Sequence, residues 1–537
     1  MPAIESNLDT ESPIFAANRA FGSALLDELR ALEARRLTAS SRAAARFARR
    51  GQHLPRERLG LLLDSGAPFL ELSPLAGFGL DHSAERSVPG AGMITGIGYV
   101  SGLRAMIVVD DAAIDAGAIQ PMTLEKFQRA QAIALREKLP FIHLIESAGA
   151  NLLRYQVEHF IHGGANFYNL CLLSALGVPV LGLVHGASTA GGAYMTGLSD
   201  YVVMVRSRAR AFLAGPPLLK AATGEVADAD DLGGAEMHAA VSGLAEYLAE
   251  DDADAVRILR ELCAALSWDR TLDTLPTGPE PLLPAEDLLG LMPADGKQPV
   301  DMREVIARIA DGSDVLEFKP DYGAATVCGH GRIFGQPVGF VTNNGPIDVA
   351  GASKAAHFIQ ACSQGGTSLV YLQNTTGYMV GLDAERGGII KHGSRMIQAV
   401  ANAEVPQVTI QCGGSFGAGN YGMCGRGFEP NFLFLWPTAR TGVMGAEQAA
   451  RTMSIVAEDG ARAQGREPDR SAIARSEAEI IETFERQTSA IHTSARLLDD
   501  GVIDPRDTRR VSGLVLAVCD AARRRKLNPK SFGVGRS

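Results

Sequence analysis

The sequence predicts an α/β protein that contains two copies of one domain. Short β-branched strands alternate with glycine turns and helical segments from about residue 90 onward. The same order of segments recurs in the second half of the chain. A length of 537 residues also exceeds the size at which one hydrophobic core stops growing. Because the repeat is far longer than that of a solenoid, it indicates duplication of a whole domain.

The first copy follows a segment, residues 30–64, with the pattern of amphipathic helices rich in arginine. These arginines fit either a solvated helix face or a contact with an acidic ligand. The copy itself reads as a hairpin, a helix, a buried strand, a second helix, another strand and a glycine-rich elbow. In order, these are residues 94–111, 124–139, 140–147, 167–177, 178–186 and 186–197.

The second copy repeats this order, and the two elbows align residue by residue, with 188–194 over 415–421. Its hairpin, helix, strand, second helix, next strand and elbow are residues 327–344, 352–366, 367–377, 392–404, 405–414 and 415–423. Between the copies lies a Pro-rich, acidic stretch that predicts a linker over 276–301. The predicted domains are therefore residues 1–275 and 302–537.

Composition excludes several classes of protein. A net charge of −10 argues against nucleic acid or an anionic membrane as the main partner. Residues 170–198 contain no Asp, Glu, Lys or Arg, but Pro179, His185 and several glycines favour a buried α/β core over a membrane span. The seven cysteines have no C-x-x-C spacing, and the acidic N-terminus lacks an apolar presequence. We therefore expect a cytoplasmic protein with reduced thiols.

The two elbows, GASTAGGAYMTG (186–197) and GGSFGAGNYGM (413–423), are the candidate chemistry. A helix that begins directly after a strand has free N–H groups at its start, and small residues let a ligand approach them. Two adjacent N–H groups there form an oxyanion hole. A single elbow is equally well explained as a tight joint. Two elbows at matching places in a duplicated domain favour the oxyanion hole.

Other catalytic patterns are missing from the sequence. No G-x-x-x-x-G-K-[ST] loop is present to hold ATP, and the histidines show neither H-x-x-x-H nor H-E-x-x-H pairing. His143, on an apolar strand, and His185, beside the first elbow, fit satisfied core histidines better than ligands. The predicted chemistry therefore depends on backbone donors.

Longer motifs resemble the carboxyltransferase β subunit of biotin-dependent acyl-CoA carboxylases. They are AGGAYMTGLSD and FLAGPPLLKAATGE in the first half, and NTTGYMVG, GGIIKHGSRMIQAV, GGSFGAGNYGMCGRGF and VMGAEQAA in the second. The likeness extends from about residue 50 to 530 and is greatest to the 3-methylcrotonyl-CoA and geranyl-CoA branch. It implies two crotonase-like (ClpP/crotonase) β-β-α superhelical domains. It also implies a β hexamer with active sites between the first domain of one subunit and the second domain of its neighbour.

The resemblance gives each elbow a role. It implies that the amides of Gly191 and Gly192 hold the acyl-CoA thioester oxygen. It implies that those of Ala418 and Gly419 hold the biotin carbonyl, beside the biotin-binding residues Phe416, Gly417 and Asn420. This chain has no M-K-M attachment motif and no ATP-binding domain, so it is not expected to make carboxybiotin alone. The resemblance implies a separate biotin carboxylase and carrier α subunit, in an α6β6 assembly. No metal and no protein base are implied.

The substrate side carries further expectations. Lys126, Arg129 and Lys220 match basic positions of the family and are expected to bind CoA phosphates; without the resemblance, each reads as a solvated cation. Ala148 and Gly149 lie in ESAGA, where the family usually has DSGGA. Gly163 and Gly164 stand near the position of a bulky aromatic residue in the methylcrotonyl branch. Small residues there predict a deep acyl pocket that fits geranyl-CoA.

Several functions remain open from the sequence. The preferred one is γ-carboxylation of geranyl-CoA or a similar long β-methyl enoyl-CoA, with 3-methylcrotonyl-CoA as the alternative substrate. A biotin-dependent acyl-CoA decarboxylase on the same fold would need membrane pump partners. A catalytically silent assembly subunit is suggested only by ESAGA, and the intact glycines of both elbows argue against it.

Overall fold

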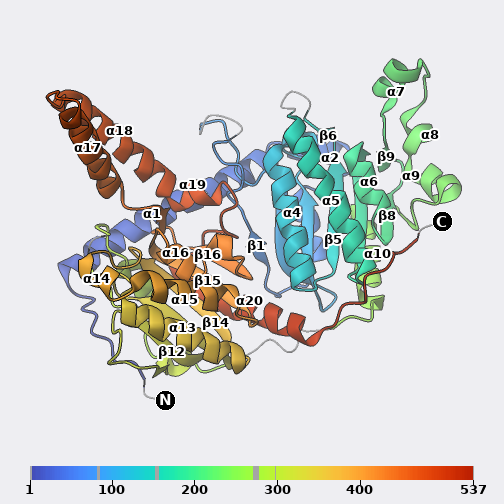
Figure 1. The fold of residues 1–537 in the computed structure, drawn as a ribbon. Coiled ribbons are helices and arrows are strands. Elements are labelled where there is room, and N and C mark those ends of the chain that lie inside the picture. The colour runs from blue at the N-terminus through green and yellow to red at the C-terminus, as the bar shows by residue number, and fades with distance from the viewer. Residues whose placement is uncertain (1–2, 81–84, 152–155, 270–276, 297, 536–537) are drawn as a thin grey trace. The chain divides into compact units, whose positions relative to one another are not determined.

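The computed structural model describes residues 3–80, 85–151, 156–269, 277–296 and 298–535 (Figure 1). The chain forms two compact units, which we name after the sequence repeat that each contains. The first-repeat unit comprises Ala31–Leu275, Ala495–Leu497 and Asp520–Ser537. The second-repeat unit comprises Met1–Arg30, Pro276–Ser494 and Leu498–Cys519.

The first-repeat unit is built on one mixed sheet in the order β1-β2-β3-β5-β7-β8-β10, with β9 also paired to β7. Pairing is antiparallel from β1 to β3 and parallel from β3 onward. The strands are β1 (Leu70–Leu72), β2 (Met93–Val100), β3 (Leu103–Asp110), β5 (Phe141–Ser147), β7 (Val180–Thr189), β8 (Tyr201–Val205), β9 (Arg210–Phe212) and β10 (Tyr247–Ala249). A small separate sheet pairs β4 (Ala118–Ile119) with β6 (Gly149–Ala150).

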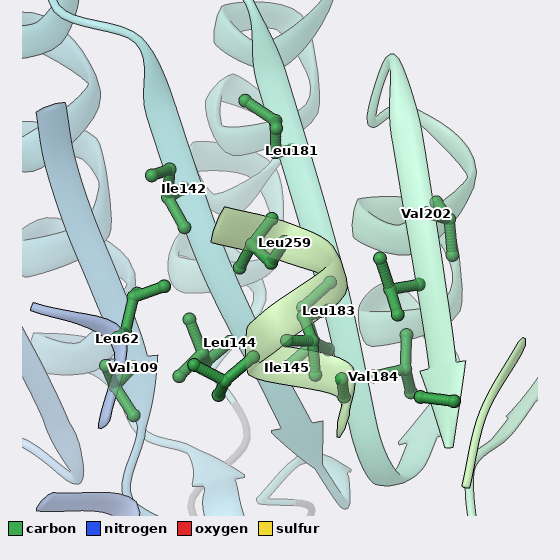
Figure 2. Close-up of a cluster of buried hydrophobic side chains, with 14 of the residues drawn as sticks. Leu62, Val109, Ile142, Leu144, Ile145, Leu181, Leu183, Val184, Val202 and Leu259 are labelled. Carbon is green, nitrogen blue, oxygen red and sulfur yellow. The ribbon is translucent and has the colours of Figure 1, made fainter. Parts of the chain in front are cut away.

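Helices cover both faces of this sheet. The helices of this unit are α2 (Ala44–Arg49), α3 (Pro55–Leu62), α4 (Pro121–Arg136), α5 (Val157–Ala175), α6 (Gly191–Gly197), α7 (Pro216–Thr223), α8 (Ala229–Gly233), α9 (Ala235–Met237) and α10 (Asp252–Ala265), of which α7 has no buried residue. Figure 2 shows the core on one face, where Leu62 and Leu259 meet strand residues such as Ile142 and Leu183. On the other face, Phe127 of α4 packs edge-on against Phe141. Burying alternate residues on opposite faces explains why the strands are apolar throughout.

The second-repeat unit has the equivalent sheet, in the order β11-β12-β13-β14-β15-β16 with β17 paired to β15. Its strands are β11 (Leu316–Glu317), β12 (Thr326–Ile333), β13 (Gln336–Asn343), β14 (Ser368–Thr375), β15 (Gln407–Phe416), β16 (Phe432–Leu435) and β17 (Arg440–Gly442). Its later helices are α11 (Leu288–Leu291), α12 (Arg303–Ala307), α13 (Val349–Gln364), α14 (Leu382–Arg386), α15 (Ile389–Ala401), α16 (Gly419–Gly422), α17 (Ala446–Ala463), α18 (Arg470–Thr488) and α19 (Ala490–Ser494). Figure 1 shows α17 and α18 as a helical hairpin.

Strand registers confirm the duplication. In the first sheet Ser147 pairs with Ser188, after an irregularity that follows Ile145, and Thr189 pairs with Phe212. In the second sheet Thr375 pairs with Ser415 after an irregularity that follows Gln373, and Phe416 pairs with Gly442. The predicted α/β architecture of two duplicated domains is therefore correct, down to the local break that precedes each elbow.

The units differ from the predicted sequence ranges at both ends of the chain. Helix α1 (Pro13–Ser41) starts in the second-repeat unit and ends in the first-repeat unit, and α20 (Thr508–Arg524) does the same. The predicted linker 276–301 is also not a free connection. Its α11 is buried, and the Phe15 ring lies against Gly290. The run LLGLM supplies apolar surface for burial. Because prolines flank this run, the sequence pattern predicts a linker instead.

Among the described residues, no helix is both long and apolar enough to cross a bilayer. The cytoplasmic location stays a prediction. Across the same part of the chain, no group of three or more His, Cys, Asp or Glu residues is arranged to hold a metal ion.

Candidate active site

The first elbow joins β7 to α6 through Ala190. This residue has φ 53° and ψ −112°, a left-handed conformation that turns the chain sharply. Its N–H donates to the carbonyl of Phe212 in β9 at 3.0 Å. Among the described residues, the turn's other backbone bonds come from Ala193 and Tyr194, which both donate to the Ala190 carbonyl, and none comes from Gly191 or Gly192. Two adjacent amides at the start of α6 are therefore free to bind an acceptor.

The second elbow has the same construction. Gly417, with φ 55°, follows β15 and donates its N–H to the carbonyl of Gly442 in β17 at 3.0 Å. Asn420 donates to the Gly417 carbonyl at 3.2 Å, as Ala193 does to Ala190 at 3.1 Å. Within the described residues, the backbone bonds of this turn leave the amides of Ala418 and Gly419 unused. Each repeat therefore offers one pair of free amides at equivalent positions.

The neighbouring strand supports each elbow in the same way. The hydroxyl of Ser147 accepts from the Gly149 N–H at 3.2 Å, and that of Thr375 accepts from the Gly377 N–H at 3.2 Å. A Cβ on Gly149 would lie 3.3 Å from the Thr189 carbonyl. Gly149 has φ 84°, which also favours glycine. Ala148, between Ser147 and Gly149 in the sequence, is exposed beside the first elbow.

Gly192 and Gly419 are glycines for a packing reason as well. A Cβ on Gly192 would lie 3.0 Å from the Ser188 hydroxyl. One on Gly419 would lie only 2.8 Å from the Cα of Gly377. Gly191 has more room, since its Cβ would meet only the edge of Phe167 at 3.3 Å. The first member of each amide pair, Gly191 or Ala418, therefore tolerates a small side chain better than the second.

Residues 413–417, GGSFG, match the G-x-S-x-G pattern of serine hydrolases. Ser415 is nevertheless fully buried in β15, and its hydroxyl accepts from the Asn420 side chain at 2.8 Å. It is therefore a structural hydroxyl that holds Asn420 in place. Phe416 and Gly417 lead directly into the elbow, so the structure brings the predicted biotin-binding residues together with Ala418 and Gly419.

A cleft of about 660 Å³ opens beside the first elbow. Ser147, Ala148 and Ala187 line its inner part. Among the described residues that line it, arginines outnumber glutamates by five to two, and three of the arginines pair with carboxylates: Arg206 with Glu250, Arg208 with Asp252 and Arg210 with Asp230. The arginines are Arg46, Arg50, Arg206, Arg208 and Arg210. The glutamates are Glu146 and Glu250.

A buried ionic cluster supports the floor of this cleft. Arg58, 1% exposed, donates to Glu146 at 2.6 Å and to Asp252 at 3.0 Å. His185 contacts Asp252 at 2.9 Å, and Arg208 contacts it at 2.7 Å. Burial and the nearby Arg58 charge lower the pKa of His185 to about 4, so its ring is neutral. Burial opposes the charge on Asp252, but its hydrogen bonds and Arg58 hold its pKa well below the usual range.

The predicted CoA-binding cations do not line this cleft. Lys126 is buried in α4, where its ammonium donates to the carbonyls of Gly90 at 3.2 Å and Met93 at 2.7 Å. Burial and the Arg36 charge lower the pKa of Lys126 to about 7. Its assignment to CoA phosphate is thus at odds with its position, because both carbonyls hold it inside the unit. Arg129 is half-buried on the same helix, and Lys220 is exposed on α7.

The two glycines expected near the acyl pocket have different surroundings on α5. A Cβ on Gly163 would lie 3.2 Å from Leu124 of α4, so this glycine lets the two helices pack closely. Gly164 is exposed, and nothing among the described residues lies within 4 Å of a Cβ placed there. Gly164 is therefore the position where a larger side chain would project away from the helix pair.

The arginines of the cleft include residues that the sequence reading left undecided. Arg46 and Arg50 belong to the arginine-rich N-terminal segment, where a solvated face and a contact with an acidic ligand were both open. Arg206, Arg208 and Arg210 were not singled out. Arg206 and Arg208 lie in the turn between β8 and β9, and Arg210 begins β9, so the clustering of arginines in RSRAR was the available signal.

Both elbows and the sheet duplication define a carboxyltransferase. Residues 47–534 match the family model for the carboxyl transferase domain, so the chain belongs to this family. More narrowly, it is a carboxyltransferase β subunit of the acyl-CoA carboxylase class, as its motifs indicated.

Several relatives are similar over nearly their whole length. A probable biotin-dependent acyl-coenzyme A carboxylase beta2 subunit of Mycobacterium tuberculosis is 47% identical, over 96% of each chain. The biotin-dependent 3-methylcrotonyl-coenzyme A carboxylase beta1 subunit of the same organism is 45% identical, over 94% of this chain and 95% of that one. The crystal structure of the β subunit of P. aeruginosa geranyl-CoA carboxylase has a TM-score of 0.93 at 50% identity, with both chains covered completely.

Proposed function

We propose that the two elbows are the two oxyanion holes of a carboxyl transfer to an enoyl-CoA thioester. The observation that carries this proposal is their equivalence: each repeat ends a strand, turns at a left-handed residue and presents two amides that the turn does not use. Gly191 and Gly192 hold the thioester oxygen. Ala418 and Gly419 hold the carbonyl oxygen of biotin.

The thioester side needs such donors because loss of a carbon-bound proton puts negative charge on the carbonyl oxygen. Two fixed N–H groups stabilise that charge without reorganising, and one such donor is worth about 10²–10³ in rate. The start of α6 adds the positive end of its backbone dipoles. The exposed ring of Tyr194 lies beside Phe167, with ring centroids 6.3 Å apart, at the rim of this elbow.

The arginine-lined cleft receives the phosphates of CoA. It adjoins the first elbow through Ser147 and Ala148, so one molecule can reach both. Guanidinium groups bind phosphate in two-pronged fashion, which suits an arginine-lined cleft for a phosphorylated substrate. Arg46 is held at the rim by its hydrogen bond to the Ala112 carbonyl at 3.0 Å. The cleft arginines therefore take the role first expected of Lys126.

The residues of the second elbow fit biotin. Ala418 is exposed with a free amide, and the exposed apolar side chains of Val380 and Val443 are available for a nonpolar ring system. Val443 belongs to this elbow, because its carbonyl is 3.2 Å from a Cβ placed on Gly417. Carboxylated biotin, when bound, supplies the carbon dioxide. Asn420 is fixed by Ser415 and orients the turn that carries both donors.

The partner is proposed to be a biotin-carrying α subunit, in an α6β6 assembly around a β hexamer. Support comes from the relatives' names, which describe biotin-dependent enzymes and beta subunits. The active site would lie between the first-repeat unit of one subunit and the second-repeat unit of its neighbour. The proposed transfer step uses backbone amides and no metal.

The proposed substrate is geranyl-CoA or a similar long β-methyl enoyl-CoA, carboxylated at the γ carbon. The 50% identity to the geranyl-CoA carboxylase β subunit favours it. The alternative, 3-methylcrotonyl-CoA, is supported by relatives of that name in Mycobacterium tuberculosis and in Drosophila melanogaster, the latter 43% identical. Either substrate uses both elbows in the same way.

The paired variants Gly191→Val and Ala418→Val test the proposal, because they alter equivalent positions that have room for a side chain. In the carboxylation assay with a biotin-carrying partner, Gly191→Val should impair use of the acyl-CoA. Ala418→Val should impair use of biotin, measured with free biotin as well as the carrier. Circular dichroism establishes that both variants fold. Wild-type rates with either folded variant would contradict the role of that elbow.

A further inference from the structure

A single carboxylate ties the cleft to the elements beneath it. Asp252 is the first residue of α10 and is 1% exposed. One of its oxygens accepts from Arg208 at 2.7 Å and faces the His185 ring at 2.9 Å. The other accepts from Arg58 at 3.0 Å and from the backbone of His53 at 2.8 Å. Asp252 therefore joins α10, β7, α3 and the β8–β9 turn.

Arg208 is anchored on one side and open on the other. One terminal nitrogen donates to the carbonyls of Arg50 at 3.1 Å and Gly51 at 2.5 Å, and the second donates to Asp252. A guanidinium has five N–H groups, so two remain. Among the described residues the buried Nε has no partner, and the other remaining N–H is on the terminal nitrogen that binds Asp252. The side chain is partly exposed and lines the cleft. It is thus held in one orientation with one terminal N–H left for a ligand.

We propose that Asp252 is a positioning residue that holds Arg208 to receive a phosphate of the CoA substrate. This inference rests on the proposed function of the cleft. Arg208 sits on a turn, and a long side chain on a turn samples many rotamers unless a partner fixes it. Asp252 supplies that partner from a rigid helix, and its own place is fixed by Arg58 and His185. The ligand thus meets a guanidinium whose orientation is already set.

Charge explains why a carboxylate is required at this position. Arg58 and Arg208 both donate to Asp252, while Glu146 accepts only from Arg58 and Gln52. Because the His185 ring is neutral, two carboxylates balance two guanidinium groups. Replacing Asp252 by asparagine keeps the shape but removes the charge that the two arginines share. Arg208 then keeps its bonds to the Arg50 and Gly51 carbonyls but loses its one charged partner, so its orientation in the cleft is less well fixed.

The experiment compares an acyl-CoA with the matching acyl-pantetheine, which has no phosphate to reach the cleft. Asp252→Asn should lower kcat/KM for the acyl-CoA about tenfold or more through KM, as expected for loss of a charged hydrogen bond. It should leave the acyl-pantetheine nearly unchanged. Arg208→Met should act alike, and the double variant should be no worse than either single one. Asp254→Asn, on the same helix with its carboxylate paired to Arg257, is the matched control.

Calorimetric titration of the full chain with CoA gives the same comparison without a partner subunit. An equal loss for both thioesters in Asp252→Asn would overturn the positioning role and leave the cleft assignment intact. No preference of the wild-type protein for the phosphorylated substrate would overturn the cleft assignment itself. If Asp252→Asn does not fold, Asp252→Glu keeps the charge but displaces it, and it should weaken acyl-CoA selectively; unchanged CoA affinity in that variant would contradict the inference.

Discussion

Ala190 and Gly417 occupy the same place in the two repeats. Their φ angles are 53° and 55°, and each donates its N–H across a parallel strand pair to a carbonyl 3.0 Å away. The equivalent position therefore has a left-handed backbone in both repeats. It is occupied by alanine in the first repeat and by glycine in the second. Glycine adopts this conformation freely, whereas alanine is strained there. The first elbow thus stores backbone strain that the second does not.

Exchanging these two residues should change stability in opposite directions. Ala190→Gly relieves strain worth about 1–3 kcal/mol and costs up to about 1 kcal/mol of chain entropy, so it should stabilise the protein modestly. Gly417→Ala should destabilise it, since the new Cβ would also lie 3.2 Å from the Val443 carbonyl. Urea unfolding of the two variants measures the difference. A destabilising Ala190→Gly would contradict the assignment of strain to the first elbow.

The second glycine of the later elbow is expected to be intolerant of any side chain. A Cβ on Gly419 would lie 2.8 Å from the Gly377 backbone, which cannot move aside without shifting β14. Gly419→Ala should therefore lower the free energy of unfolding by about 1–3 kcal/mol. Gly445→Ala is the control, because nothing among the described residues lies within 4 Å of its Cβ. Similar unfolding midpoints for both variants would count against this packing.

The order of elements could be predicted from the sequence because it depends on local pattern. The hairpin at 94–111 became β2 and β3, and the strand at 140–147 became β5, each within a residue or two. Helix α5 begins at Val157, ten residues before the predicted start. Its first turns carry exposed apolar side chains (Val157, Phe160 and Ile161), and the Gly163-Gly164 pair that follows disfavours a helix in the sequence pattern. The chain ends could not be assigned to units in advance. Their membership depends on tertiary burial, as with Phe15 against Gly290.

The candidate site, like the fold, could be predicted only in part from the sequence. Both elbows could be predicted, since small residues between a strand and a helix are a local signal. The cleft could not, because Arg46 and Arg208 are far apart in sequence and meet only in the folded unit. The burial of Lys126 could not be predicted for the same reason. Its helical spacing from Arg129 gave no sign that α4 turns its ammonium inward to two carbonyls.

The carboxyl group of Asp499 should make stability depend on pH. It is fully buried and accepts from Ser494 at 2.8 Å and from the Gly501 N–H at 2.9 Å. Burial, with the adjacent Asp500, raises its pKa to about 7. A raised pKa means that the protonated group favours the folded state. Its contribution is complete below the unfolded pKa near 4 and is lost as the pH rises through 7, by up to about 4 kcal/mol.

Asp499→Asn removes this titration. The stability of the variant relative to the wild-type protein should therefore increase as the pH rises. The difference in Tm between the two should move in favour of the variant from pH 4.5 to pH 8. Other titrating groups are common to both proteins and cancel in the difference. Asp507→Asn, at a half-exposed carboxylate, provides the comparison. A difference in Tm that is the same at both pH values would exclude a buried titrating Asp499.

The last prediction concerns the length of the acyl chain. A double bond conjugated to the thioester lets the γ carbon lose a proton, because the charge spreads to the oxygen that the first elbow holds. The same elbow therefore serves geranyl-CoA and 3-methylcrotonyl-CoA, and pocket depth must separate them. Each further buried methylene contributes about 0.8 kcal/mol, so room for the longer chain dominates selectivity. The unaltered enzyme should use geranyl-CoA at least as well as 3-methylcrotonyl-CoA.

Gly164→Phe is the variant that tests this depth, since Gly163→Phe would drive a ring into Leu124 and disturb the α4–α5 packing instead. Gly164 has open space, so the ring can occupy the proposed acyl path without breaking the fold. It should lower kcat/KM for geranyl-CoA far more than for 3-methylcrotonyl-CoA. Gly460→Phe, at another exposed helical glycine with open space, should leave both unchanged. A strong preference of the unaltered enzyme for the five-carbon acyl group would refute the deep pocket, because a pocket with room for the longer chain should bind geranyl-CoA at least as well.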